Sequence, residues 1–265
     1  MIHPALQILL GLLFVVGLMS LLWFIQRRTG NAGIVDVAWS GAIGVLGMFF
    51  AATAAGDANR RLLVASLIGL WSLRLTVYLF RRVVGHPEEG RYATLRANWG
   101  EDADRRFFRF YQMQAMAAFV FALPILVIAW NPEPLSPLPF AASVGLWFVG
   151  VGGLSLADRQ LERFKSDPDN AGKTCREGLW HYSRHPNYFF EWIHWWAYLP
   201  LAAFAPYWWI ALAVPLLLLY FFLFVTGIPP TEAQAIASRG EDYRRYQQTT
   251  SAFVPWFPKR SMTHP

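Results

Sequence analysis

Long apolar runs without formal charge limit what this 265-residue chain can fold into more than any other feature. The first run, from Pro4 to Ile25, contains no Asp, Glu, Lys or Arg. A helix needs about 20 such residues to cross the hydrocarbon core of a bilayer. The run is too long for the core of a signal peptide, and no small-residue cleavage site clearly follows it. We therefore expect it to remain as a transmembrane helix.

The composition also indicates a membrane protein. Charged residues make up 15% of the sequence, whereas soluble domains carry roughly a quarter. We expect an all-α integral membrane protein that forms a single domain over residues 1–265 and crosses the bilayer seven times. The predicted transmembrane helices are Pro4–Ile25, Ile34–Ala55, Leu62–Phe80, Met113–Trp130, Leu138–Leu161, Tyr188–Phe204 and Tyr207–Gly227.

Lys and Arg are distributed unequally between the two sides of this topology. The first, third and fifth loops and the C-terminal tail hold 20 of the 23 basic residues, whereas the opposite side holds only Arg60 and Arg61. Cytoplasmic loops carry such an excess of positive charge. We therefore expect the N-terminus outside and the C-terminus in the cytoplasm. The asymmetry explains most of the net charge of +6, so a nucleic-acid partner is not needed.

The stretch from Gly178 to Glu191, GLWHYSRHPNYFFE, places a polar cluster at the mouth of the sixth predicted span. Ionisable groups at a membrane edge are costly unless something pairs with them, so they are functional hypotheses by default. Pro186 favours the first turn of a helix, and a helix N-terminus suits phosphate or pyrophosphate. A large anionic cofactor would satisfy the cluster, whose members are Tyr182, Arg184, His185, Asn187, Tyr188 and Glu191.

Two charged residues lie inside predicted spans. Asp36, near the start of the second span, should face the bundle interior, where desolvation would raise its affinity for a proton and allow it to donate a hydrogen bond. Alternatively, it is an interface residue or the partner of an arginine. Arg74 must pair with an acid, a carbonyl or a ligand phosphate, and Tyr78 shares its helix face four residues on. A pair of Arg74 with Asp36 could also line a pocket.

Further charged residues flank the fifth and seventh spans. Asp158, Glu162 and Lys165 share one face of the fifth span's end, which is usually solvated surface. A short polar loop joins this end to the 178–191 cluster, and this proximity favours a ligand-binding role. Glu232, just below the last span, could meet the same cytoplasmic pocket.

The sequence lacks the common nucleotide and metal motifs. There is neither a GxGxxG loop nor a Walker motif, so a nucleotide would bind without a Rossmann or P-loop fold. The spacing of His181, His185, Glu191 and His194 is not that of a zincin. We therefore expect no catalytic metal.

Together these residues resemble a known family. The combination of Tyr182-Ser-Arg-His-Pro-Asn187-Tyr, Glu191, upstream Asp158 and the ending Pro255-Trp-Phe-Pro258 is similar to the steroid 5α-reductase superfamily. More narrowly, it resembles the bacterial branch, long catalogued as a domain of unknown function. The resemblance covers most of the chain and is strongest over 158–258. Sterol C14 and Δ7 reductases carry a similar Arg-His-Pro-Asn-Tyr element, and isoprenylcysteine carboxyl methyltransferases carry Arg-His-Pro-x-Tyr.

The resemblance implies a membrane enzyme that binds NADPH from the cytoplasmic side. It would reduce the C4–C5 double bond of 3-oxo-Δ4 steroids or similar enone lipids by hydride transfer. Asp36 stands where steroid reductases have a Gln-Glu pair, Trp71 takes the place of their third-span tyrosine by spacing, and Tyr78 is the nearest phenol. The implied catalytic residues are Asp36, Tyr78 and Glu191. The family's cofactor positions fall on Arg74, Asp158, Lys165, Lys173 and Asn187, with Tyr182 beside them. From the polar cluster we add Arg184, His185 and Tyr188 to the expected cofactor-binding residues. We expect a monomer in the bacterial inner membrane rather than the endoplasmic reticulum.

Two other functions stay open. One is an S-adenosylmethionine-dependent membrane methyltransferase that acts on a lipophilic acceptor. Asn187 and the basic residues favour the reductase, because three phosphates need more positive charge than a sulfonium cofactor does. The other is a non-enzymatic scaffold or transporter, for which Asp158→Ala and Asn187→Ala would leave ligand binding unchanged.

Overall fold

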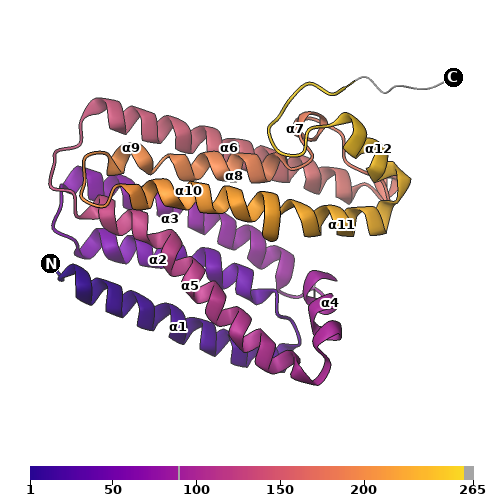
Figure 1. Ribbon diagram of the computed structural model, residues 1–265, viewed down its shortest axis with the longest axis horizontal. Coiled ribbons are helices and arrows are strands. Elements are labelled where there is room, and N and C mark those ends of the chain that lie inside the picture. The colour runs from indigo at the N-terminus through magenta and orange to yellow at the C-terminus, as the bar shows by residue number, and fades with distance from the viewer. Residues whose placement is uncertain (89, 260–265) are drawn as a thin grey trace. The chain divides into compact units, whose positions relative to one another are not determined.

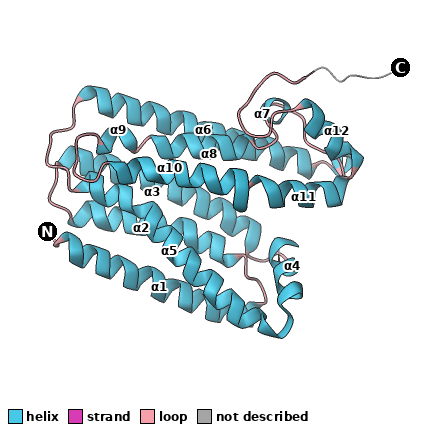
Figure 2. Ribbon diagram, in the orientation of Figure 1, coloured by secondary structure: helices cyan, strands magenta, loops and turns pink. Residues whose placement is uncertain are grey.

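The apolar runs form helices in a computed structural model of the protein, which describes residues 1–88 and 90–259 (Figure 1). Apart from one isolated bridge, the described residues contain no β-structure (Figure 2). The helices are α1 (Pro4–Thr29), α2 (Ile34–Thr53), α3 (Ala58–Val83), α4 (Gly90–Trp99), α5 (Ala103–Ala129), α6 (Pro137–Ser166), α7 (Leu179–Tyr182), α8 (Pro186–Trp196), α9 (Leu199–Ala202), α10 (Trp209–Tyr220), α11 (Ile228–Arg239) and α12 (Glu241–Thr249). A π-helical turn, Phe221–Val225, follows α10.

Six helices in the described part of the chain are long and apolar enough to cross a membrane. They are Pro4–Thr29, Ile34–Thr53, Ala58–Val83, Gly90–Ala129, Pro137–Ser166 and Trp209–Arg239. This finding supports the predicted all-α integral membrane protein. The predicted span Tyr188–Phe204 differs, because it folds as α8 and α9 with a break at Ala197 and Tyr198. Pro200 has no N–H to donate to the helix and so contributes to the interruption.

The chain forms two compact units. The first unit comprises Met1–Ser136 and Leu201–Ala211. Its core is built where α2 packs against α3 and α5. Small residues allow a close approach of α2 and α3: a Cβ on Gly44 would lie 2.1 Å from the Ser72 hydroxyl, and one on Gly47 would lie 2.8 Å from Ile68. Such contacts are typical of membrane helices, whose association depends on close packing.

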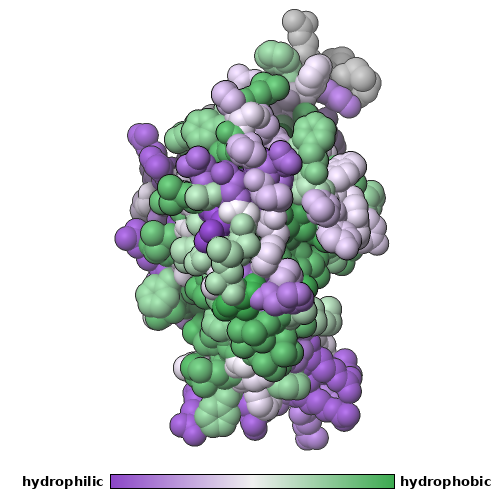
Figure 3. Space-filling view, turned by 90° about the vertical axis from the view of Figure 1, so that its left-hand side faces the viewer, coloured by the Kyte–Doolittle hydropathy of each residue, from purple (hydrophilic) through white to green (hydrophobic). Residues whose placement is uncertain are grey.

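Helix α1 buries a single narrow stripe. Its buried residues recur mainly at every fourth position and are Gln7, Gly11, Val15, Met19 and Gln26. The remaining face carries exposed apolar side chains such as Leu9, Leu13 and Leu21. Many further apolar side chains are exposed, and apolar surface covers much of the face in Figure 3. A face of this kind suits contact with lipid, since burying it in a bilayer removes apolar area from water.

The second unit comprises Pro137–Pro200 and Leu212–Pro265, described here as far as residue 259. Helices α6 and α8 pack together at two glycines of α6. A Cβ on Gly150 would lie 2.5 Å from the backbone nitrogen of His194, and one on Gly153 would lie 2.3 Å from the ring of Phe190. This close contact fixes α8, which begins directly after the Arg184-His185 pair.

Candidate functional site

An acid–phenol pair lies in the first unit. The hydroxyl of Tyr92, on α4, donates to Oδ1 of Asp36 on α2 at 2.8 Å, and Tyr92 is fully buried. Asp36 has further interactions. From the sequence, Tyr78 is the phenol expected in the catalytic set, and the structure adds Tyr92 as a phenol that donates to Asp36. This hydrogen bond links α4 to the start of α2.

An ion pair holds α4 near the start of α2. Arg96 donates to both carboxylate oxygens of Glu88, at 2.8 and 3.0 Å. Glu88 in turn accepts from the backbone N–H of Ala32 at 2.8 Å. Tyr111 donates to the carbonyl of Ala32 at 2.9 Å. Burial alone would raise the pKa of Glu88, but the hydrogen bonds from Arg96 and Ala32 outweigh it and lower that pKa. The ionised Glu88 therefore stabilises the loop that positions Tyr92.

Arg74 and Tyr78 belong to the same helix, α3. The guanidinium carbon of Arg74 lies 5.4 Å from the centre of the Tyr78 ring, within the range of a cation–π contact. Both residues have further interactions. Their predicted common face is therefore confirmed, while their roles stay predictions.

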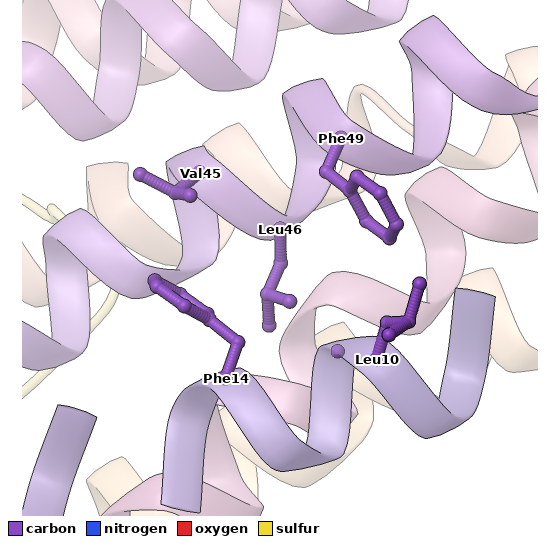
Figure 4. A pocket seen from close by; sticks show the side chains of 6 residues that line it. Leu10, Phe14, Val45, Leu46 and Phe49 are labelled. Carbon is purple, nitrogen blue, oxygen red and sulfur yellow. The ribbon is translucent and has the colours of Figure 1, made fainter. Parts of the chain in front are cut away.

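The first unit also contains an apolar cavity of about 190 Å³ between α1 and α2 (Figure 4). Its lining residues are Leu10, Gly11, Phe14, Val45, Leu46 and Phe49. None of them is a predicted site residue. A lining without hydrogen-bonding side chains suits hydrocarbon and gives a phosphate nothing to bind.

In the second unit, the short helix α7 docks on the end of α6 beside Asp158. Trp180 donates its indole N–H to the carbonyl of Ala157, and the backbone N–H of Leu179 donates to Gln160, both at 2.9 Å. Gly178 precedes this contact with a φ of 57°, and a Cβ there would lie 2.2 Å from the Gln160 side chain. The polar loop therefore brings the Asp158 turn next to residues 178–180, as the sequence indicated.

Arg184 is part of a buried ion pair. Its Nε donates to Oε1 of Glu232 on α11 at 2.6 Å, and only 11% and 13% of the two side chains are exposed. Nη1 of Arg184 donates to the carbonyls of Gln247 and Thr250, at 3.1 and 2.6 Å. Glu232 thus neutralises much of the charge that the sequence had suggested for a phosphate.

Glu232 also receives other donors of the second unit. His185 Nε2 lies 3.2 Å from its Oε1, Tyr243 donates at 3.3 Å, and Gln247 donates to Oε2 at 2.7 Å. Burial lowers the pKa of His185, although Glu232 acts in the opposite direction. Burial and the nearby carboxylate raise the pKa of Tyr243, which stays a hydrogen-bond donor. Glu232 is therefore the centre of a polar network that we call the Glu232 network (Arg184, His185, Glu232, Tyr243 and Gln247).

Three stacked rings adjoin the Glu232 network. The His185 and Tyr188 rings are 5.2 Å apart at an angle of 10°, and those of Tyr188 and Phe222 are 4.7 Å apart at 13°. Phe222 belongs to the π-helical turn, a rare element that is frequent at functional sites. The Tyr188 hydroxyl lies 3.1 Å from that of Thr231. The stack fixes the first turn of α8 against α11.

The C-terminal segment 250–259 closes over residues 182–184. Ser183 and Ser251 form the isolated bridge, and Arg184 N–H donates to Ser251 at 2.8 Å. Trp256 N–H donates to the carbonyl of Tyr182 at 2.9 Å. Tyr246 donates to the carbonyls of Trp180 and Ser183. The Arg-His-Pro element is therefore held by the chain's own C-terminal residues.

The other predicted site residues of this unit have different surroundings. Asp158 is 5% exposed, whereas Lys165, Lys173 and Tyr182 are exposed. Asn187 accepts from the backbone N–H of Tyr188 at 3.0 Å. Glu191 accepts from the Trp195 indole at 3.0 Å on the same helix. The cofactor and catalytic assignments of these residues stay predictions.

The contacts of Glu232 and the role of Tyr92 could not be predicted from the sequence. Glu232 was noted for its place just below the last span, but its four donors come from distant segments that show no common spacing. In the sequence, Tyr92 falls in a charged stretch of mixed composition between two apolar runs, and no periodic pattern singles it out.

Two comparisons with known proteins bear on these observations. The chain is 29% identical to a Delta(14)-sterol reductase, ERG24A, of Gibberella zeae over 93 residues, which cover 30% of this chain and 19% of that protein. The chain thus matches about a fifth of the length of this curated relative. A family model described as a protein of unknown function, DUF1295, matches residues 22–250. The chain therefore belongs to the DUF1295 family.

Proposed function

We propose that this chain is a membrane reductase that uses NADPH to saturate a C=C bond conjugated to a ketone in a steroid or a similar lipid. The hydrogen bond between Asp36 and the fully buried Tyr92 is the observation that carries the proposal. An acid and a phenol in an apolar bundle suit the stabilisation of negative charge on a carbonyl oxygen. The similarity to a sterol reductase supports the same class of reaction.

In this proposal the protein's residues position and polarise the reactants. Asp36 in its protonated form donates a hydrogen bond to the carbonyl oxygen of the substrate, and Tyr92 orients Asp36 through its own hydrogen bond. The surrounding helices exclude water, which strengthens such electrostatic interactions. The nicotinamide would supply the hydride to the β-carbon of the enone, and the resulting enolate would take up one proton from solvent at its α-carbon.

The second unit offers a donor set that fits a dinucleotide phosphate. Lys165 and Lys173 have exposed ammonium groups that can reach phosphates, and Asp158 beside 178–180 can accept from a ribose hydroxyl or an amide. Asn187 and Tyr182 add neutral hydrogen-bonding groups. Arg184 and His185 position this segment through Glu232, and we assign them support of the cofactor site rather than the main phosphate contacts.

We also propose seven crossings, with the N-terminus outside and α8 and α9 together forming the sixth. Phe204, 95% exposed after α9, would then face outward, and Glu177 would face the cytoplasm. Single cysteines at these two positions in a Cys175→Ser background test this with a membrane-impermeant thiol reagent. Labelling of both positions from one side would contradict the sixth crossing.

A membrane methyltransferase is the second candidate. Neutralisation of Arg184 by Glu232 favours it, because less positive charge is then left for three phosphates. Purified protein in detergent should oxidise NADPH in the presence of enones such as progesterone and testosterone if the reductase is correct. Binding of S-adenosylmethionine without any binding of NADPH would support the methyltransferase instead.

A further inference from the structure

The indole N–H of Trp39 is a buried donor without a hydrogen-bond partner among the described residues. Trp39 lies on α2, three residues after Asp36, so the two side chains lie on neighbouring parts of one helix face. Buried polar groups nearly always have partners, and each exception needs an explanation. An indole can donate but cannot accept, so only an acceptor would satisfy it.

The aromatic neighbours of Trp39 supply no such acceptor. The ring of Phe121 is 5.5 Å away at 68°, and that of Trp71 is 6.4 Å away at 80°. Phe121 has no polar atom, and Trp71 offers only another donor. The nearby Ser40 hydroxyl donates to the Val37 carbonyl and contacts Thr76. The Trp39 ring thus packs edge-on against two aromatic rings that leave its N–H unsatisfied.

We infer that Trp39 is a specificity-determining residue whose indole N–H donates to an oxygen atom of the lipid-like substrate. This inference rests on the proposed function and adds a donor to the Asp36–Tyr92 pair. The Tyr92 hydroxyl already donates to Asp36, and Asp36 can donate only when it is protonated. Trp39 donates in every protonation state of the site. A ligand with the same apolar body but no oxygen would leave this N–H unsatisfied and would bind more weakly.

The test uses ¹⁵N-indole-labelled full-length protein in detergent, with testosterone and its 3-deoxo analogue as probes. Trp39→Phe identifies the Trp39 signal, and Trp23→Phe is the matched control because Trp23 already donates to the Asp104 carbonyl. Testosterone should move the Trp39 signal downfield, and the analogue should not. Trp39→Phe should weaken testosterone binding about tenfold, the equivalent of one hydrogen bond, and should leave the analogue's affinity unchanged.

The outcomes separate this inference from the proposed function. A Trp39 signal that stays unmoved by testosterone, or a Trp39→Phe variant that prefers testosterone over the analogue as strongly as the unsubstituted protein does, overturns the role of Trp39. Absence of NADPH binding or oxidation overturns the reductase and leaves the Trp39 result to stand by itself. If Trp39→Phe does not fold, the unsubstituted protein can still overturn the inference, because a titration in which testosterone shifts no indole signal beyond those that the analogue shifts excludes a hydrogen bond from Trp39 to the substrate oxygen.

Discussion

At the scale of single residues, the hydrogen bond from Tyr92 to Asp36 is the contact on which the proposed chemistry depends. Tyr92→Phe keeps the ring and removes the hydroxyl, so Asp36 loses a donor that orients it. We expect kcat for NADPH oxidation with an enone to fall about 100-fold, the usual loss when one stabilising donor is removed. KM should change little, because the interaction matters mainly in the transition state.

Tyr78→Phe is the matched control for this change. It leaves the ring over which Arg74 lies, so it should change kcat by much less. Equal losses in the two variants would refute the preference for Tyr92 over the phenol that the sequence indicated.

The ion pair of Arg184 and Glu232 should dominate the stability of the second unit. Removing one partner of a buried pair leaves the other charge uncompensated, at a cost of about 3 kcal/mol. Glu232→Ala should therefore lower the thermal unfolding midpoint in detergent by about 6–12 °C. Glu241→Gln serves as control, since Glu241 and Arg244 are mostly exposed and such pairs contribute little. A Glu232→Ala protein as stable as the control would show that the network is not structural.

His185 should make stability depend on pH. Its pKa in the folded protein is lowered by burial from 6.5, so the folded state binds fewer protons than the unfolded state below this pH. Stability should be constant above about pH 6.5 and should fall as the pH drops from there towards the lowered pKa. His185→Gln should flatten thermal unfolding midpoints measured between pH 7 and 5, and His181→Gln, at an exposed position, should not. Identical slopes in both variants would exclude His185 as the source.

Residue chemistry could be predicted in part. Asp36 stood out because a carboxylate inside an apolar run is costly, and the structure shows it hydrogen-bonded. Its phenolic partner could not be predicted, because α4 reaches it through a tertiary contact that leaves no trace in local spacing. Arg184 stood out for its charge, yet only the structure shows that Glu232 and two backbone carbonyls take up its donors.

At the scale of helices, the contact of α6 with α8 should tolerate no side chain at Gly150. A Cβ there would lie 2.5 Å from backbone nitrogen and 2.6 Å from Cα of His194, and backbone cannot move aside as a flexible side chain can. Gly150→Ala should therefore lower the thermal unfolding midpoint. Gly152→Ala, with nothing within 4 Å of its Cβ, should leave the midpoint unchanged or raise it, because alanine favours a helix. A harmless Gly150→Ala would contradict the close packing.

The helices themselves could be predicted well where the apolar pattern was long. Six of the seven expected spans coincide with long apolar helices in the described chain. The remaining one is interrupted, because Pro200 acts at a point where hydropathy shows no break. Helix α4 and the stacked turn around Tyr188 depend on contacts between distant segments, which hydropathy does not record.

At the scale of the whole molecule, the first unit carries the acid–phenol pair and the second unit carries a polar, partly basic segment. The asymmetry of Lys and Arg predicted that this segment faces the cytoplasm, where reduced pyridine nucleotides are available. The sequence could not predict that Glu232 would compensate one of the expected phosphate-binding charges. Binding of NADPH is therefore the part of the proposal that an experiment can test most directly.

Binding of NADPH to the purified protein, measured by calorimetry in detergent, tests the central claim most directly. We predict saturable binding that weakens with added salt, because exposed lysines contact the phosphates. Lys173→Ala and Asn187→Ala should weaken it, while Lys259→Ala, an exposed lysine outside the proposed site, should not. Absence of any heat of binding with NADPH, with and without added lipid, would contradict the account.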